Sequence, residues 1–117
     1  MTRQTDEPGG RVKDLSREDP RPMDAVLDGY PWLPRMIDKA RASRAATLGP
    51  YYRYPCPIDR DCLDRLGLSA DAFAEVAVDG RNDAEVLERI SRLVPDLSRL
   101  ASFEPLRLNA SLHRDGS

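Results

Sequence analysis

One short segment of the chain concentrates the side chains best suited to binding an anion. It contains Arg35, Asp38, Lys39 and Arg41. A guanidinium contacts a carboxylate or phosphate through two parallel hydrogen bonds, and a lysine ammonium attracts the same groups as a point charge. The alternative is an ordinary charged surface, either a solvated helix face or ion pairs with the acidic helices of residues 61–96.

A second group of reactive side chains follows in the loop after this helix. Tyr54, Cys56 and Asp59 are close in sequence, and a pocket between helix 31–46 and loop 51–62 would bring them beside the cations. The ligand-binding candidates are therefore Arg35, Asp38, Lys39, Tyr54, Cys56 and Asp59.

The two cysteines, Cys56 and Cys62, allow two further hypotheses. A zinc site requires about four ligands, and the single histidine of the chain, His113, lies far away near the C-terminus, so we predict no metal site. A reactive thiolate needs a nearby cation or a helix N-terminus, and both cysteines meet part of that condition. The alternative is that they are structural thiols, which are commoner in protein interiors.

The one tryptophan and all four tyrosines lie between Gly29 and Pro55, interleaved with Arg35 and Arg53. Stacking on nucleic-acid bases is one interpretation, but the net charge of −2 and the absence of a broad basic stripe argue against it. Tyrosine and tryptophan more often anchor interfaces, because they bury much area and keep one polar tip. The interface candidates are Tyr30, Trp32, Tyr51 and Tyr52.

The elements that must position these residues are predicted to be helical. The apolar residues Leu33, Met36, Ile37 and Ala40 recur at helical spacing and predict a helix from about 31 to 46. A Pro/Tyr-rich loop follows, and then short helices over 60–66, 69–79, 82–94, a turn or two after Asp96, and a last segment from Pro105. Asp59, Ser69, Asn82 and Asp96 are the predicted N-caps, and Gly67 and Gly80 end helices.

The expected architecture is therefore all-α, a small irregular bundle of about five short helices with the Pro/Tyr-rich loop after the first long one. At 117 residues the chain suits one domain, assigned here to residues 23–117. Residues 1–22 are rich in proline, glycine and charge and are predicted to form a flexible leader, with Leu15 as its one possible anchor. Met23 to Leu27 is predicted to form a helical turn.

The charge is unevenly divided between two parts of the chain. Residues 35–60 carry six cations against two acids, a net of +4, whereas residues 61–96 carry nine acids against four cations, a net of −5. The two oppositely charged parts can face each other within one chain or across a homodimer.

The chain contains no apolar run long enough to span a bilayer and begins with a polar segment, which predicts a cytoplasmic protein without membrane attachment.

The order of motifs resembles that of a bacterial family catalogued only as a domain of unknown function. The resemblance rests on Lys13-Asp14-Leu15, on the GYPWLPRMIDKAR segment from Gly29, and on the Cys-Pro-Ile-Asp turn at Cys56, and it covers about residues 13–94. Members of that family usually end in a helix with a tryptophan, and residues 95–117 depart from that pattern. The resemblance implies no activity, cofactor or partner.

Two functions remain open on these observations. The first is a cytoplasmic helical module that self-associates as a homo-oligomer through its aromatic residues. The second is a domain or enzyme that binds a small anionic ligand between helix 31–46 and loop 51–62. No nucleotide-binding glycine motif or serine nucleophile elbow is present, so no cofactor is predicted.

Overall fold

Residues 12–116 are described by the computed structural model, and their side chains from residue 12 to residue 111. The fold is mostly helical, with one small two-stranded sheet, so it is not strictly all-α as the sequence suggested. Its elements in chain order are β1 (Val26–Leu27), β2 (Tyr30–Pro31), α1 (Leu33–Ala45), α2 (Pro57–Leu66), α3 (Ala70–Asp79), α4 (Asp83–Leu93), the 3₁₀ helix η2 (Leu97–Ser102) and α5 (Pro105–Gly116). Within the described residues, none of these helices has the length and apolar character needed to cross a bilayer.

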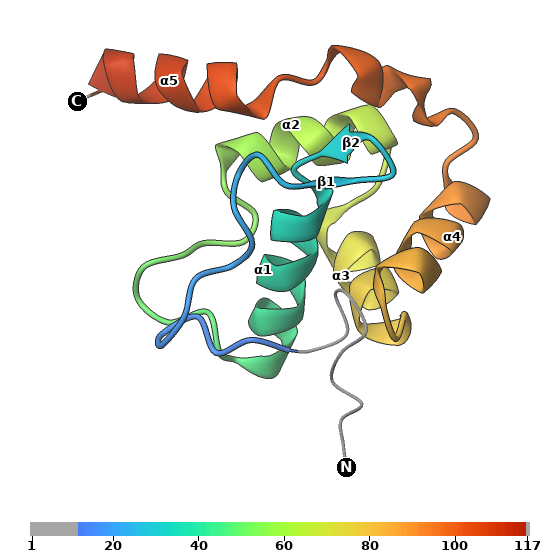
Figure 1. Ribbon diagram of the computed structural model, residues 1–117, viewed down its shortest axis with the longest axis horizontal. Coiled ribbons are helices and arrows are strands. Elements are labelled where there is room, and N and C mark those ends of the chain that lie inside the picture. The colour runs from blue at the N-terminus through green and yellow to red at the C-terminus, as the bar shows by residue number, and fades with distance from the viewer. Residues whose placement is uncertain (1–11, 117) are drawn as a thin grey trace.

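Helix α1 stands in the middle of the molecule, with α2 across its N-terminal end and α3 beside it, whereas η2 and α5 lie over α2 (Figure 1). The predicted apolar stripe is confirmed, since Leu33, Met36, Ile37 and Ala40 are all fully buried. The solvated helix face that the sequence allowed as the alternative for the four charged residues is wrong for three of them. Asp38 is 1% exposed, and Lys39 and Arg41 are each 3% exposed. Helix α1 is thus buried on nearly all sides, because α3 and the segments before and after α1 cover it as well.

The helical turn predicted over Met23–Leu27 is replaced by a single turn, closed by the Ala25 N–H donating to Pro22 O at 3.1 Å, and by the first strand of a short β-hairpin. Val26 pairs with Pro31 and Leu27 with Tyr30 in antiparallel register. The connecting residues Asp28 and Gly29 have φ angles of 53° and 84°. Two consecutive positive φ angles produce the tight turn that matches the twist of the strands, and Asp-Gly is a preferred pair for it. With only two residues in each strand, no alternating pattern was available to reveal the hairpin.

The local signals at the helix ends are mostly confirmed. The side chains of Ser69, Asn82 and Asp96 cap α3, α4 and η2 by accepting backbone N–H groups. Gly67 ends α2 with a left-handed φ of 76°. The start of α2 was misplaced, because the helix begins at Pro57 and Cys56 is its N-cap.

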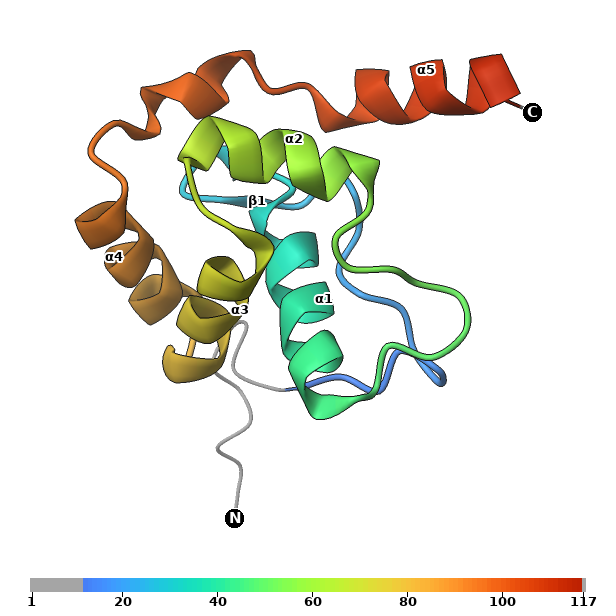
Figure 2. The same cartoon turned by 180° about the vertical axis from the view of Figure 1, so that it is seen from behind.

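A segment that the sequence assigned to a flexible leader packs along the domain. We call residues 12–22 the N-terminal strap; it runs beside the loop after α1 in both views (Figures 1 and 2). Leu15 is 1% exposed, its N–H donates to Thr47 O at 2.7 Å, and Thr47 Oγ1 donates to Lys13 O at 2.8 Å. The rest of the predicted leader, residues 1–11, lies outside the described residues.

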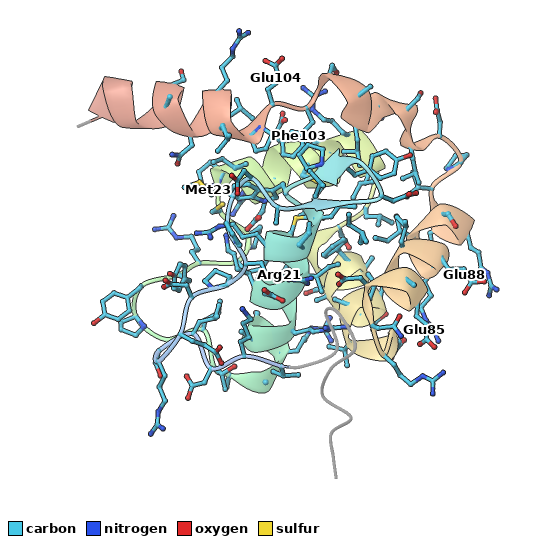
Figure 3. The ribbon with its side chains drawn as sticks, viewed as in Figure 1. Arg21, Met23, Glu85, Glu88, Phe103 and Glu104 are labelled. Carbon is cyan, nitrogen blue, oxygen red and sulfur yellow. The ribbon has the colours of Figure 1, made fainter. Side chains whose placement is uncertain are left out.

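Arg21 fastens the strap across two helices (Figure 3). Its Nε and Nη2 donate to the two carboxylate oxygens of Asp38 on α1, both at 3.1 Å. Its Nη1 donates to Asp83 Oδ2 at the start of α4 at 2.6 Å. Hydrogen bonding to the two carboxylates outweighs the effect of burial, so the pKa of Arg21 is raised. One guanidinium therefore joins three segments that are far apart in sequence.

We expect Arg21→Met to lower the free energy of unfolding by about 3 kcal/mol, because it removes the guanidinium from the buried carboxylates of Asp38 and Asp83. Asp38 then keeps the backbone N–H of residue 21 and the more distant Lys13 Nζ, at 3.7 Å. Urea denaturation followed by circular dichroism measures this change. Arg17→Met is the matched control, since Arg17 is 85% exposed and pairs loosely with Asp14; its effect should stay below about 0.5 kcal/mol. Equal effects of the two substitutions would show that the bridge does not stabilise the fold.

Candidate functional site

An open pocket of about 440 Å³ lies between α1, the loop after it and the first turn of α2. We call it the Arg35 pocket. It lies between helix 31–46 and loop 51–62, where the sequence predicted a pocket. The binding of a ligand there stays a prediction. The lining residues come from the segment just after the strap, from α1 and its N-cap, from the loop, and from α2 and α5: Met23, Trp32, Arg35, Lys39, Tyr51, Tyr52, Arg53, Cys56, Pro57, Ile58 and Asn109.

Arg35 is held in the pocket wall by two aromatic rings and the strap. Its guanidinium carbon lies 5.6 Å from the ring centroids of both Trp32 and Tyr52. Its Nη1 donates to Arg21 O at 3.1 Å. Its Nε is buried and has no hydrogen-bond partner among the described residues. An unpaired buried donor is unfavourable by about 1–3 kcal/mol, so the contacts of Arg35 leave part of its hydrogen-bonding capacity unused.

Lys39 is fixed by a buried carboxylate beneath the pocket. Its Nζ lies 2.8 Å from Asp59 Oδ2 and 5.8 Å from the ring centroid of Trp32. Asp59 Oδ1 accepts the indole N–H of Trp32 at 2.7 Å, and its Oδ2 also accepts the N–H of Cys56 at 2.9 Å. Asp59 is fully buried, and both of its carboxylate oxygens accept hydrogen bonds from these partners. It is the third residue of α2 and completes the capping box with Cys56, rather than serving as the N-cap that the sequence predicted.

The structure separates two other ligand candidates from the pocket. Asp38 lies on another side of α1 and is held by Arg21 and Lys13. Tyr54 donates its hydroxyl to Ala70 O at 2.7 Å, and burial raises the pKa of that hydroxyl. Neither residue lines the pocket. Of the six candidates, Arg35, Lys39 and Cys56 line it and Asp59 lies beneath it.

The four interface candidates have different environments. Trp32 is 2% exposed and Tyr30 is half-buried in β2, so neither is a free surface ring. Tyr52 donates its hydroxyl to Asp19 of the strap, and this hydrogen bond raises the pKa of Tyr52. Tyr51 is 77% exposed. The aromatic cluster thus forms a pocket wall and part of the core, with one strongly exposed ring.

Several lining residues were missed as site candidates. Arg53 was noted beside the tyrosines, and that position between three aromatic residues was a usable signal. Asn109 and Met23 had no such signal, because they lie far from Arg35 in sequence. Asn109 follows Arg35 by 74 residues, and Met23 precedes it by 12.

The cysteines differ in exposure and role. Cys56 is half-buried at the pocket, and its sulfur accepts the Asp59 N–H at 3.4 Å. Cys62 is fully buried within α2, and burial raises the pKa of its thiol, which stays protonated at neutral pH. The catalytic hypothesis for Cys62 is therefore unsupported by its environment. In the part of the chain that the structure describes, no three His, Cys, Asp or Glu side chains come together as a metal site would require.

Comparison with known families adds a classification and no activity. Residues 17–99, more than two thirds of the chain, match the model of a family described as a domain of unknown function (DUF5069). The matched range contains the strap from Arg17 onward, α1 to α4 and most of the pocket lining. A search among curated proteins found no match.

We expect one cysteine per chain to react quickly with Ellman's reagent at pH 8, and the other only after unfolding. Cys56 is partly accessible, whereas the Cys62 sulfur is enclosed and protonated. Cys56→Ser should abolish the fast phase in a stopped-flow absorbance trace. A fast phase of two thiols per chain in the native protein would contradict the enclosed position of Cys62.

Asp59→Asn should lower the free energy of unfolding by about 3 kcal/mol, since Lys39, with a 4% exposed side chain, loses its counter-charge. Asp61→Asn on the same helix is the control. Its side chain is 36% exposed and pairs with Arg65 at 2.9 Å, so we expect a change below about 1 kcal/mol. Guanidinium titrations of both variants test this, and a similar small change in both would refute the importance of the buried pair.

Proposed function

We propose that this chain, which belongs to the DUF5069 family, binds a small phosphorylated molecule in the Arg35 pocket. The observation that supports this best is the charge of the lining. Three cations, Arg35, Lys39 and Arg53, face the pocket, and no carboxylate is among the described residues that line it. A cluster of like charges in one hollow is unfavourable by itself and becomes favourable when an anion neutralises it.

The net charge of the site favours a phosphate over a carboxylate. The three cations and the carboxylate of Asp59 beneath them leave a net charge of +2. A phosphate monoester carries about −1.5 to −2 at neutral pH, whereas a single carboxylate carries −1. The phosphate therefore neutralises the site more completely.

The cations are also positioned before any ligand arrives. The Arg35 guanidinium lies between two rings and its Nη1 is hydrogen bonded, and the Lys39 ammonium is held by Asp59. Side chains that are already ordered lose less conformational entropy on binding. Arg53, which is exposed, is the adaptable member of the set.

The first turn of α2 adds a smaller contribution. Pro57 and Ile58 of that turn line the pocket, and the N-terminal end of a helix carries partial positive charge. The capping box occupies the N–H groups of Cys56 and Asp59. This helix end therefore adds a weak attraction for an anion to the stronger attraction of the three cations.

The proposal is for binding rather than catalysis, since the lining offers no carboxylate or imidazole as a general base.

Isothermal titration of the full chain with inorganic phosphate and with propyl phosphate tests the proposal. We expect one saturable site whose affinity falls as salt is added, because the attraction is electrostatic. Arg53→Ala should weaken binding about tenfold without unfolding the protein, since this exposed residue supplies one charged contact. Arg35→Lys should also weaken it, because a lysine cannot keep the stacked geometry.

The control is Arg92→Ala on α4, a 73% exposed arginine that does not line the Arg35 pocket. Its affinity for both phosphates should stay within about twofold of that of the parent. Absence of saturable binding, or an equal loss in Arg53→Ala and Arg92→Ala, would contradict a phosphate site in the Arg35 pocket.

Self-association and a cytoplasmic location stay predictions of the sequence. With Trp32 buried and Tyr52 tied to the strap, an aromatic dimer interface would depend mainly on Tyr51. Light scattering at increasing protein concentration, compared with Tyr51→Ala, measures that contribution.

A further inference from the structure

We propose that α5 determines which phosphate monoester the Arg35 pocket accepts, through the carboxamide of Asn109. This inference rests on the proposed function. It assigns Asn109 to the uncharged part of the ligand and predicts that this part carries a hydroxyl group.

The beginning of α5 is anchored firmly enough to position a binding residue. Phe103, just before α5, is 3% exposed, and Pro105 is buried. The guanidinium of Arg65 on α2 lies 5.7 Å from the ring centroid of Phe103 and donates a hydrogen bond to Ser102 Oγ. Phe103 lies between α2 and the chain entering α5 (Figure 3). From there α5 runs over α2 and past the rest of the domain in both ribbon views (Figures 1 and 2).

Asn109 lies on the face of α5 that is turned toward the domain. Residues 105, 108 and 109 share one helix face, because they are three and four positions apart. Pro105 is buried and Leu108 packs against the core. Asn109 is the polar member of this inward face, and it lines the Arg35 pocket. No hydrogen bond joins its side chain to the residues that the structure describes, so its donor and acceptor remain available to a ligand.

The chemistry of Asn109 complements that of the cations. Arginine and lysine only donate hydrogen bonds, and they recognise the phosphate oxygens. A carboxamide both donates and accepts, so it can pair with a hydroxyl group. Among the residues that line the pocket, Asn109 is the one carboxamide. A few placed polar groups of this kind usually fix the orientation of a ligand.

The residues proposed to bind the phosphate and the residue proposed to select the ester also differ in their position relative to the family match. Arg35, Lys39 and Arg53 lie within the matched residues 17–99, whereas Asn109 lies beyond them. The phosphate-binding part of the pocket therefore belongs to the shared region, and the selective part comes from the helix that follows it.

Two matched probes test this inference by isothermal titration of the full chain: glycerol 3-phosphate, which carries hydroxyl groups, and propyl phosphate, which has none. We expect the parent protein to prefer glycerol 3-phosphate, and Asn109→Leu to reduce that preference about fivefold through the loss of an uncharged hydrogen bond. The affinity for inorganic phosphate should not change in this variant. Ser111→Leu, on the exposed opposite face of α5, is the control and should keep the preference.

A second variant distinguishes the loss of the carboxamide from a change in local packing caused by leucine. Asn109→Asp keeps the size of the side chain and adds a negative charge, so it should weaken all three phosphates. If the parent and Asn109→Leu bind both esters with the same ratio, or if Asn109→Asp leaves every affinity unchanged, the role of Asn109 is refuted while the phosphate site stands. If none of the three probes binds the parent, the proposed function itself is refuted.

Discussion

A central helix that is buried on nearly every side can hold charged residues only if distant segments supply their partners. Helix α1 imposes this constraint on the whole molecule. Asp38 is paired by Arg21 of the strap, and Lys39 by Asp59 of α2. Arg41 donates to Ala77 O at 2.7 Å and to Gly80 O at 2.8 Å, at the C-terminal end of α3. Burial lowers the pKa of Arg41, and the helix-end carbonyls accept two of its hydrogen bonds while its Nη1 has no partner among the described residues.

These contacts explain why short elements assemble in one arrangement. Buried ion pairs add little net stability compared with apolar side chains of the same size, because removing charges from water is costly. Breaking one is strongly unfavourable, because the remaining charge is left unpaired. Arrangements that separate Arg21 from Asp38, or Lys39 from Asp59, are therefore disfavoured. The strap and α2 are located by polar pairing as well as by apolar packing around Leu15 and Cys62.

The same constraint shapes the pocket. The carboxylate of Asp59 and the carbonyl of Arg21 are the partners that hold Lys39 and Arg35 in its wall. Both cations retain donor capacity beyond those contacts, since a lysine ammonium has three donors and the Arg35 Nε has no partner among the described residues. A structural requirement of α1 thus leaves an organised positive surface at the edge of the fold. The hydroxyl of Tyr52, bound to Asp19, ties this surface to the strap.

Local rules account for the parts of the fold that the sequence determined. The apolar stripe of α1, the N-caps Ser69, Asn82 and Asp96, and the C-cap Gly67 depend on residues within a few positions, and all were predictable. The cationic segment and the loop at Cys56 border the Arg35 pocket, because α1 and α2 are connected through that loop; that this pocket is a binding site stays a prediction. The two-residue strands gave no periodic signal, so the hairpin was missed.

Only the tertiary structure decided which charges meet and which distant residues line the pocket. Arg21 and Asp83 are 62 residues apart, Lys39 and Asp59 are 20 apart, and Asn109 reaches the pocket from the last helix. Asp38 and Lys39 are adjacent in sequence, yet one binds the strap and the other α2, because neighbouring helical positions differ by about 100° around the axis. Sequence spacing fixes such directions on a single helix, but the identity of the partner depends on how the other segments pack around it.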